Sequence, residues 1–344
     1  MIRPLALLAA LAAAVALTAC GSKDDDNAGA PPRKALSLLL DYQPNPDHAG
    51  IYAAQARGDF TRAGLNLEIA TPGDAAAPLS VLASGRTDLA ISYEPEVLLA
   101  RDKGARVVAV AALAQAPLTS VMAIGSAKIT SIADLAGKTV GTAGIPYQSA
   151  YLKTLLDDAG VDESKVKQVD VGFNLVPAMV SKRVDATLGA YWNVEGVQLR
   201  QERKKPEIIR MESAGLPTYD ELVLVAREDW LREPGNGALV RRFVQALQTA
   251  TRAVQADPQV GVDALADVAE GYDRKLLAAS IKATLPVLFP EGDKPFGWME
   301  PREWEEFSRW MLRNKLVKVL PNDAALTNEF LPGEGVIAAD EDAR

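Results

Sequence analysis

The order of strand-like and helix-like segments predicts an α/β protein with two lobes around a cleft. From Ala35 onward, short apolar runs alternate with segments of helical periodicity, a pattern typical of a sheet with helices on both faces. A second alternating unit begins near Ser120, and the apolar strand 222–226 then returns the chain to the first unit. Because the strands are almost continuously apolar, we expect a parallel sheet that is buried on both faces.

The first unit is predicted to contain four strands and three helices. Pro95 suits the first turn of one helix, and Gly104 lies just past its end. Gly58 and Gly85 end the other two helices. The predicted strands are 36–40, 65–70, 89–92 and 107–112, and the predicted helices are 48–57, 78–84 and 94–103.

The second unit follows the same alternation, and the last third of the chain is mostly helical. Ser131 and Asp134 have the spacing of a capping box, which predicts the start of a helix. A helix at 149–159 ends at Gly160, and a long amphipathic helix covers 239–254. The predicted strands are 139–142, 166–171, 186–190, 207–211 and 222–226.

These segments divide the chain into a signal peptide, a tether, two lobes and a C-terminal tail. The stretch 24–33 is acidic and then rich in Ala, Gly and Pro, which is typical of a flexible tether. The hinge strands are expected near 113–121 and 218–225, where the chain passes between the lobes. The parts are a signal peptide at 1–19, a tether at 20–34, a first lobe at 35–117 plus 222–330, a second lobe at 118–221 and a C-terminal tail at 331–344.

The N-terminus has the pattern of a bacterial lipoprotein signal. Arg3 precedes the apolar run 5–17, which is shorter than the roughly 20 apolar residues needed to span a bilayer. Leu17-Thr18-Ala19-Cys20 resembles the lipobox, in which the cysteine becomes the lipidated first residue of the mature protein. We therefore predict an exported protein, anchored by lipid at Cys20 to the bacterial cell membrane and facing the periplasm or the cell exterior. A plain signal peptide with a chance cysteine is the alternative.

Composition and charge argue against several classes of function. The 344 residues are 48 % hydrophobic and 24 % charged, and the net charge of −8 argues against nucleic acid or anionic lipid as the main partner. With a single His, and with the only cysteine modified, we expect no disulfide and no metal site. The sequence has no P-loop, no G-x-S-x-G motif and no free cysteine nucleophile, so we expect no cofactor and no enzymatic activity.

Ligands of open α/β sheets bind beyond the carboxyl ends of the strands, so the strand-to-helix loops form the candidate site. The loop 41–48 is stiffened by two prolines, and Asn45 and His48 can point into the cleft. Asp47 is expected to cap the following helix. For His48, local hydrogen bonding at the helix start is the alternative to lining the cleft.

Two further loops add candidate residues. After the strand 89–92, Tyr93 offers an aromatic wall and Glu94 is either a site residue or a helix cap, whereas Glu96 is expected to be solvated. The loop 142–149 opens a helix, whose first backbone N–H groups can bind anions or carbonyl oxygens. Its candidate side chains, which an ordinary strand-to-helix turn would also contain, are Tyr147, Gln148 and Ser149.

The fourth loop carries adjacent aromatic residues and a carboxylate. Tyr191 and Trp192 follow the strand 186–190 and suit stacking on a planar ring. Asn193 is also a candidate, and Glu195 lies one turn from Trp192. A carboxylate in that position can accept an amino N–H and a protonated ring nitrogen together, as an aminopyrimidine edge presents them. The alternative places both aromatic rings in the core and Glu195 in solvent.

Four stretches of the chain resemble the thiamine-pyrimidine-precursor-binding proteins, which belong with the nitrate, sulfonate and taurine binders of ABC importers. The resemblance covers about 36–227 and lies in NPDHAGIY at 45–52, AISYEPE at 90–96, GIPY at 144–147 and GAYWNVE at 189–195. It implies a type II periplasmic-binding-protein fold with two α/β lobes, a ligand cleft and a hinge. It also implies an aminopyrimidine held between aromatic rings, with a Glu on its polar edge.

The resemblance implies a receptor that captures a thiamine pyrimidine precursor, such as a hydroxymethyl- or formylaminopyrimidine, and closes on it. The partners implied are an ABC permease and a separate ATPase, and we expect a monomer that contacts the membrane only through its lipid anchor. Another small nutrient, namely a riboflavin precursor, a sulfonate such as taurine, or nitrate, is the alternative ligand. The residues carried over as ligand-binding are Asn45, Tyr93, Tyr191, Trp192 and Glu195.

An enzyme of the same fold is the alternative from another class. The fungal pyrimidine synthase consumes its own His together with bound pyridoxal phosphate, and its motif matches Pro46-Asp47-His48. That synthase also carries a Cys-rich iron motif, and the present sequence has no cysteine beyond Cys20. The stretch 41–48 contains no Lys that could hold pyridoxal as a Schiff base, so we predict a binding protein.

Overall fold

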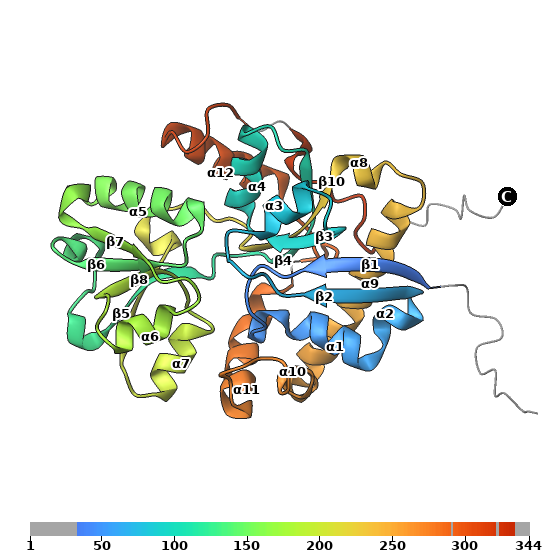
Figure 1. The fold of residues 1–344 in the computed structure, drawn as a ribbon, viewed down its shortest axis with the longest axis horizontal. Coiled ribbons are helices and arrows are strands. Elements are labelled where there is room, and N and C mark those ends of the chain that lie inside the picture. Colours follow the sequence, from blue (N-terminus) through green and yellow to red (C-terminus); the bar gives the residue numbers. More distant parts are fainter. Residues whose placement is uncertain (1–32, 290–291, 321–322, 334–344) are drawn as a thin grey trace, which may run out of the picture. The chain divides into compact units, whose positions relative to one another are not determined.

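Two five-stranded sheets, each with helices packed against it, make up the described part of the chain (Figure 1). The computed structural model describes residues 33–289, 292–320 and 323–333, all within the unit Arg33–Arg344. The predicted signal peptide, Cys20, nearly all of the predicted tether and the tail beyond residue 333 lie outside the described residues. No helix in these ranges is both long enough and apolar enough to cross a membrane.

The first sheet combines early strands with one that returns later in the chain. Its spatial order is β2 (Leu65–Ala70), β1 (Lys34–Leu39), β3 (Leu89–Ser92), β10 (Leu222–Arg227) and β4 (Val107–Ala114). β1 is parallel to β2 and β3, whereas β10 is antiparallel to both of its neighbours. The four strands predicted for the first unit therefore run in the same direction, as expected, and the returning β10 makes the sheet mixed. β10 begins at Leu222 beside Ala114, where β4 ends, so the returning chain enters the sheet in the opposite direction.

The second sheet is mixed in the same way. Its spatial order is β7 (Lys167–Asp170), β6 (Thr139–Thr142), β8 (Ala186–Tyr191), β5 (Thr119–Ile124) and β9 (Pro206–Arg210). β6 is parallel to β7 and β8, and β5 is antiparallel to β8 and β9. Four residues connect β4 of the first sheet to β5 of the second. In the second sheet, β5 runs opposite to both of its neighbours, as β10 does in the first.

Helices from both ends of the described chain pack on the first sheet. α1 contacts α9 and α10, and α2 contacts α9, so the predicted helical last third returns to the first unit (Figure 1). Phe60 of α2 stacks on Phe243 of α9 with ring centroids 5.0 Å apart. The helices outside 118–221 are α1 (Ala49–Arg57), α2 (Asp59–Arg62), α3 (Pro78–Ala83), α4 (Glu94–Asp102), α8 (Glu228–Leu231), α9 (Asn236–Ala256), α10 (Pro258–Leu265), α11 (Arg274–Thr284) and α12 (Pro301–Arg313).

Helices also follow the strands of the second sheet. They are α5 (Pro146–Asp158), α6 (Leu175–Val180) and α7 (Glu195–Gln201). The predicted capping box is confirmed, with Ser131 and Asp134 bonding reciprocally, but it opens only the single 3₁₀ turn η3 (Ile132–Leu135). α5 begins three residues earlier than predicted because Pro146, whose ring presets a helical φ, occupies its first turn.

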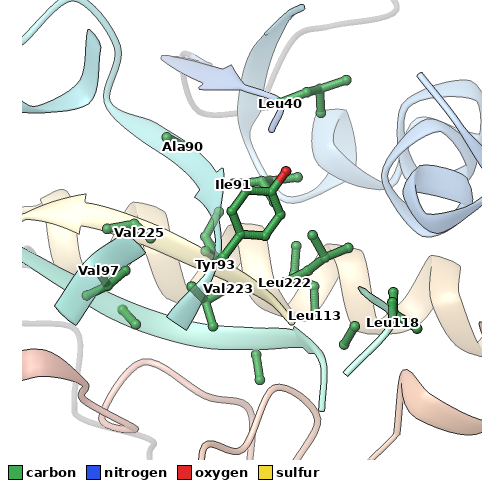
Figure 2. Close-up of a cluster of buried hydrophobic side chains, with 14 of the residues drawn as sticks. Leu40, Ala90, Ile91, Tyr93, Val97, Leu113, Leu118, Leu222, Val223 and Val225 are labelled. Carbon is green, nitrogen blue, oxygen red and sulfur yellow. The ribbon is translucent and has the colours of Figure 1, made fainter. Parts of the chain in front are cut away.

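The core of the first sheet fixes where the first site residues begin. All residues of β3 and β4 are buried, and Ile91, Leu113 and Leu222 pack in one cluster (Figure 2). Full burial of each such side chain contributes about 1.5–3 kcal/mol to stability. Tyr93 follows β3 directly and lies beside Ile91 in this cluster, so packing of the strand sets its position (Figure 2).

Candidate functional site

Loops that follow strands of both sheets meet at one pocket, which encloses about 370 Å³ including its opening to solvent. The segments after β1 and β3 contribute from the first sheet, and those after β6 and β8 contribute from the second. These are carboxyl ends of strands, as expected for a ligand site in an open α/β sheet. The lining residues are Asp41, Tyr42, Asn45, Tyr93, Ala143, Ile145, Tyr147, Gln148, Leu175, Gly189, Tyr191, Val194 and Glu195.

Asn45 organises the loop after β1. Its side-chain oxygen accepts the backbone N–H of Asp47 at 2.8 Å and caps the 3₁₀ turn η1 (Pro46–His48). Its own backbone N–H donates to Nδ1 of His48 at 3.2 Å, which completes a capping box. The prediction that Asp47 caps the next helix is therefore wrong, because Asn45 already occupies the cap position.

His48 holds a carboxylate of the pocket rather than lining the pocket itself. Because its Nδ1 accepts a backbone N–H, its proton lies on Nε2, which donates to Oδ1 of Asp41 at 2.9 Å. The hydroxyl of Tyr93 donates to the other oxygen of Asp41, also at 2.9 Å. All three side chains are buried. The local hydrogen bonding that we considered for His48 is what the structure shows, and it fixes the orientation of Asp41.

Four tyrosines surround the pocket. Tyr42 and Tyr93 come from the first sheet, and Tyr147 and Tyr191 from the second. The rings of Tyr93 and Tyr147 contact each other directly, with centroids 5.6 Å apart. Loss of hydration raises the pKa of all four phenols, so each remains neutral at physiological pH and can donate a hydrogen bond. Such walls can stack against a planar ring and hydrogen-bond to its edge.

Glu195 is the second carboxylate of the pocket. It lies in the first turn of α7 and accepts the backbone N–H of Tyr191 at 2.7 Å. Loss of hydration, together with the nearby charge of Asp47, raises the pKa of this carboxyl to about 7 against the lowering effect of the Tyr191 hydrogen bond. Because no residue lining the pocket in the described chain is Lys or Arg, the site suits ligands that carry donors or positive charge.

A close approach between Gln148 and Gly189 shapes the floor of the pocket. Gln148 is buried, and its oxygen accepts the backbone N–H of Ala143 at 2.8 Å. A Cβ atom on Gly189 would lie 2.4 Å from Nε2 of Gln148, and the φ of +115° at this position favours glycine. Glycine at 189 therefore lets the Gln148 amide reach the pocket.

Glu94, Ser149 and Trp192, predicted from the sequence as ligand-binding, lie outside the pocket lining. Glu94 is completely buried and accepts the backbone N–H of Asp220 at 2.8 Å. Ser149 is exposed on α5. The indole N–H of Trp192 donates to the carbonyl of Pro117 at 3.0 Å. The guanidinium of Arg210 lies over the face of the same ring, 4.0 Å from its centroid.

Asn193 and Glu96 also lie in surroundings that differ from those predicted from the sequence. Asn193 is completely buried and bonds Asp47 and Thr284 instead of facing the pocket. The prediction that Glu96 is solvated is wrong, because the first turns of α4 and α5 pack together and Glu96 accepts the backbone N–H of Tyr147 at 3.3 Å. Loss of hydration there raises the pKa of Glu96 to about 7.

Sequence reasoning did not single out Asp41, Tyr42 or Glu221. Asp41 and Tyr42 lie just beyond the end of β1, and this position after a strand could have marked them as candidates. Glu221 precedes β10 and is completely buried. Its Oε2 accepts the backbone N–H groups of Leu118 and Thr119 at 2.8 and 2.9 Å, and its Oε1 lies 3.4 and 3.5 Å from the hydroxyls of two pocket tyrosines, Tyr147 and Tyr191.

Metal binding has no obvious location in the described residues. No group of three or more His, Cys, Asp or Glu side chains there is arranged to hold a metal ion.

Two mixed α/β sheets with a pocket between their strand ends define a protein of the periplasmic-binding-protein fold. The periplasmic aliphatic sulphonate binding protein of Escherichia coli shares this fold, with a TM-score of 0.64 at 15 % sequence identity over 87 % of this chain and 94 % of that one. More narrowly, the chain belongs to the NMT1/THI5 like family, whose model matches residues 45–260.

One similar protein is named as a binding protein and another as an enzyme. A formylaminopyrimidine-binding protein of Halalkalibacterium halodurans is 33 % identical over 89 % of this chain and 92 % of its own length. A 4-amino-5-hydroxymethyl-2-methylpyrimidine phosphate synthase of Legionella pneumophila is 25 % identical over 87 % of this chain and 93 % of its own length.

Proposed function

We propose that this protein is the extracytoplasmic receptor of an ABC importer and captures a thiamine pyrimidine precursor, a hydroxymethyl- or formylaminopyrimidine. The observation that carries the proposal is a pocket walled by four tyrosines that holds two carboxylates, Asp41 and Glu195, and no lining Lys or Arg in the described chain. The 33 % identity to a formylaminopyrimidine-binding protein over most of both chains supports the same ligand class.

The chemistry of an aminopyrimidine fits these groups. Glu195 can accept an amino N–H and an adjacent protonated ring nitrogen together, a charge-assisted pair of hydrogen bonds. The pKa of Glu195 is raised to about 7, and hydrogen bonds donated by such a ligand would favour the ionised form of this carboxyl. The proposed ligand contacts are Asn45, Tyr93, Tyr147, Gln148, Tyr191 and Glu195, with Asp41 and Tyr42 added from the pocket lining.

Capture works through closure of two lobes in this proposal. The first lobe is 35–117 plus 222–330 and the second is 118–221, with hinges near 113–121 and 218–225. A ligand that contacts loops of both sheets stabilises the closed arrangement, which the permease then recognises. A separate ATPase supplies the energy of transport. The protein acts as a monomer, exported and held at the membrane by lipid on Cys20.

An anionic ligand is the less favourable alternative. A sulfonate or nitrate would need hydrogen-bond donors or positive charge, whereas the pocket offers the carboxylates of Asp41 and Glu195. Repulsion between like charges in a partly dehydrated site opposes that binding.

A synthase-like enzyme is the alternative suggested by the synthase relatives. It would use His48 with pyridoxal phosphate, but both ring nitrogens of His48 are already bonded to Asn45 and Asp41. Within the described chain, the pocket lining contains no Lys to hold pyridoxal as a Schiff base. We therefore propose binding without catalysis.

Titration calorimetry tests the proposal. The chain without residues 1–20 would be titrated with formylaminopyrimidine, hydroxymethylpyrimidine, thiamine, riboflavin and taurine. We expect stoichiometric binding of a pyrimidine precursor and no heat with taurine. Tight binding of taurine without any pyrimidine response would contradict the proposed ligand class, and modification of His48 on incubation with pyridoxal phosphate would favour the enzyme.

A further inference from the structure

A buried polar cluster joins the two loops that flank the pocket. The side-chain nitrogen of Asn193 donates to Oδ1 of Asp47 at 2.5 Å and to the hydroxyl of Thr284 at 2.6 Å. The Thr284 hydroxyl lies 2.9 Å from the same oxygen of Asp47. Asn193 and Thr284 are completely buried and Asp47 is 7 % exposed. We call these three residues the clasp.

The clasp connects segments that are far apart in the sequence and belong to different sheets. Asp47 lies in the loop after β1 of the first sheet, and Thr284 ends α11. Asn193 follows β8 of the second sheet. On each side the clasp is flanked by pocket residues, with Asn45 two positions before Asp47 and Glu195 two positions after Asn193.

We propose that the clasp holds the two site loops together when the pocket closes, so that Asn193 and Thr284 are positioning residues for ligand binding. The proposal rests on the proposed function, because it assigns the clasp to the capture of the same ligand. Asn193 acts through the loops and does not touch the ligand, since it lies outside the pocket lining.

The hydrogen-bonding pattern of the clasp suits reversible closure. Oδ2 of Asp47 and Oδ1 of Asn193 are buried and have no hydrogen-bond partner among the described residues. A buried acceptor without a partner is unfavourable, and water would hydrate both atoms when the loops separate. The short bonds favour the closed arrangement while the unpartnered oxygens disfavour it, so the balance remains sensitive to ligand.

The test uses substitutions that remove one member of the clasp together with its two bonds inside the cluster. Asn193→Ala removes the shared donor, and Thr284→Val removes the hydroxyl at nearly constant volume. Thr284→Ser restores a hydroxyl. Ser280→Ala is the matched control, because Ser280 lies one turn earlier on α11, is completely buried and has a hydroxyl without a partner in the described chain.

The ligand readout is stopped-flow binding of formylaminopyrimidine. We expect Asn193→Ala and Thr284→Val to raise the dissociation rate about tenfold, with a smaller change in the association rate, as for loss of buried hydrogen bonds in the bound state. The double variant should be no worse than the single variants, because both changes break the same cluster. Ser280→Ala should behave as the unchanged protein does, whereas Thr284→Ser should dissociate more slowly than Thr284→Val because it restores the hydroxyl.

A second readout does not depend on the ligand. Hydrogen exchange at the amides of Asp47 and His48, which bond within their own loop, should become faster in Asn193→Ala although the substitution lies on the other sheet. Unchanged exchange there, with and without pyrimidine, would overturn the clasp. If the unchanged protein binds no pyrimidine, the proposed function fails, while the exchange result still decides whether the clasp exists.

Discussion

At the scale of single residues, the proposed preference for an aminopyrimidine depends most on Glu195. Its carboxylate lines the pocket, is oriented by the backbone N–H of Tyr191, and has a pKa raised to about 7. The other pocket carboxylate, Asp41, already accepts hydrogen bonds from His48 and Tyr93. Glu195 therefore has more remaining capacity to accept donors from a ligand.

The first prediction concerns Glu195→Ala. Loss of a charged hydrogen-bond partner should weaken binding of formylaminopyrimidine by about 2 kcal/mol or more, roughly 30-fold in Kd. Calorimetric titration measures the change. Glu202→Ala is the control, because Glu202 is exposed beyond the end of the same helix and should leave the affinity unchanged. Equal affinity of Glu195→Ala and the unchanged protein would remove Glu195 from the site.

At the scale of secondary-structure elements, Glu221 ties together the two connections between the sheets. It stands at the start of β10 and accepts the backbone N–H groups of Leu118 and Thr119, which lead into β5. The Thr119 hydroxyl also donates to it at 2.8 Å, and that of Tyr219 at 3.0 Å. One side chain thus bonds to both segments where hinge strands are predicted.

Substitution of Glu221 should destabilise the fold more than substitution of its neighbour. Glu221→Ala leaves two buried backbone N–H groups without an acceptor, and we expect a loss of about 3 kcal/mol in the free energy of unfolding, measured in urea. Asp220→Asn is the control, since it keeps an acceptor for the indole N–H of Trp304 and removes a charge beside Glu94. Equal losses in both variants would contradict the role given to Glu221.

At the scale of the whole molecule, several buried carboxyl groups make stability depend on pH. Loss of hydration raises the pKa of Asp47 to about 6 and those of Glu96, Glu195 and Asp220 to about 7. These groups bind protons more strongly in the folded protein than in the unfolded chain. Exposed carboxyls with lowered pKa, such as Asp134, affect stability only below about pH 4.

The free energy of unfolding should therefore fall as pH rises from about 4.5 to 7 and beyond, because the folded state holds more protons over this range. We expect a lower urea midpoint at pH 8 than at pH 5.5. The variant Glu96→Gln, which cannot ionise, should show a smaller difference between the two conditions. A midpoint that increases with pH in the unchanged protein would contradict this account.

The sequence predicted most elements because their signals are local. The strands 65–70, 89–92 and 139–142 match β2, β3 and β6 in full, since each is a short run of apolar, alternating or β-branched residues with turn residues nearby. The α/β class and the type II binding fold followed from the order of elements together with the four resembling stretches. The direction of β10 was missed, because it depends on where the returning chain enters the sheet.

Within the site, the sequence by itself determined which loops follow the strands and which aromatic and carboxylate side chains they carry. Only the tertiary structure decided which side chains face the pocket. Glu195 and Asn193 are two residues apart in one loop, yet one lines the pocket and the other is buried against Asp47 and Thr284. The direction of a side chain in a loop depends on partners that are distant in the sequence, and no local pattern encodes those partners.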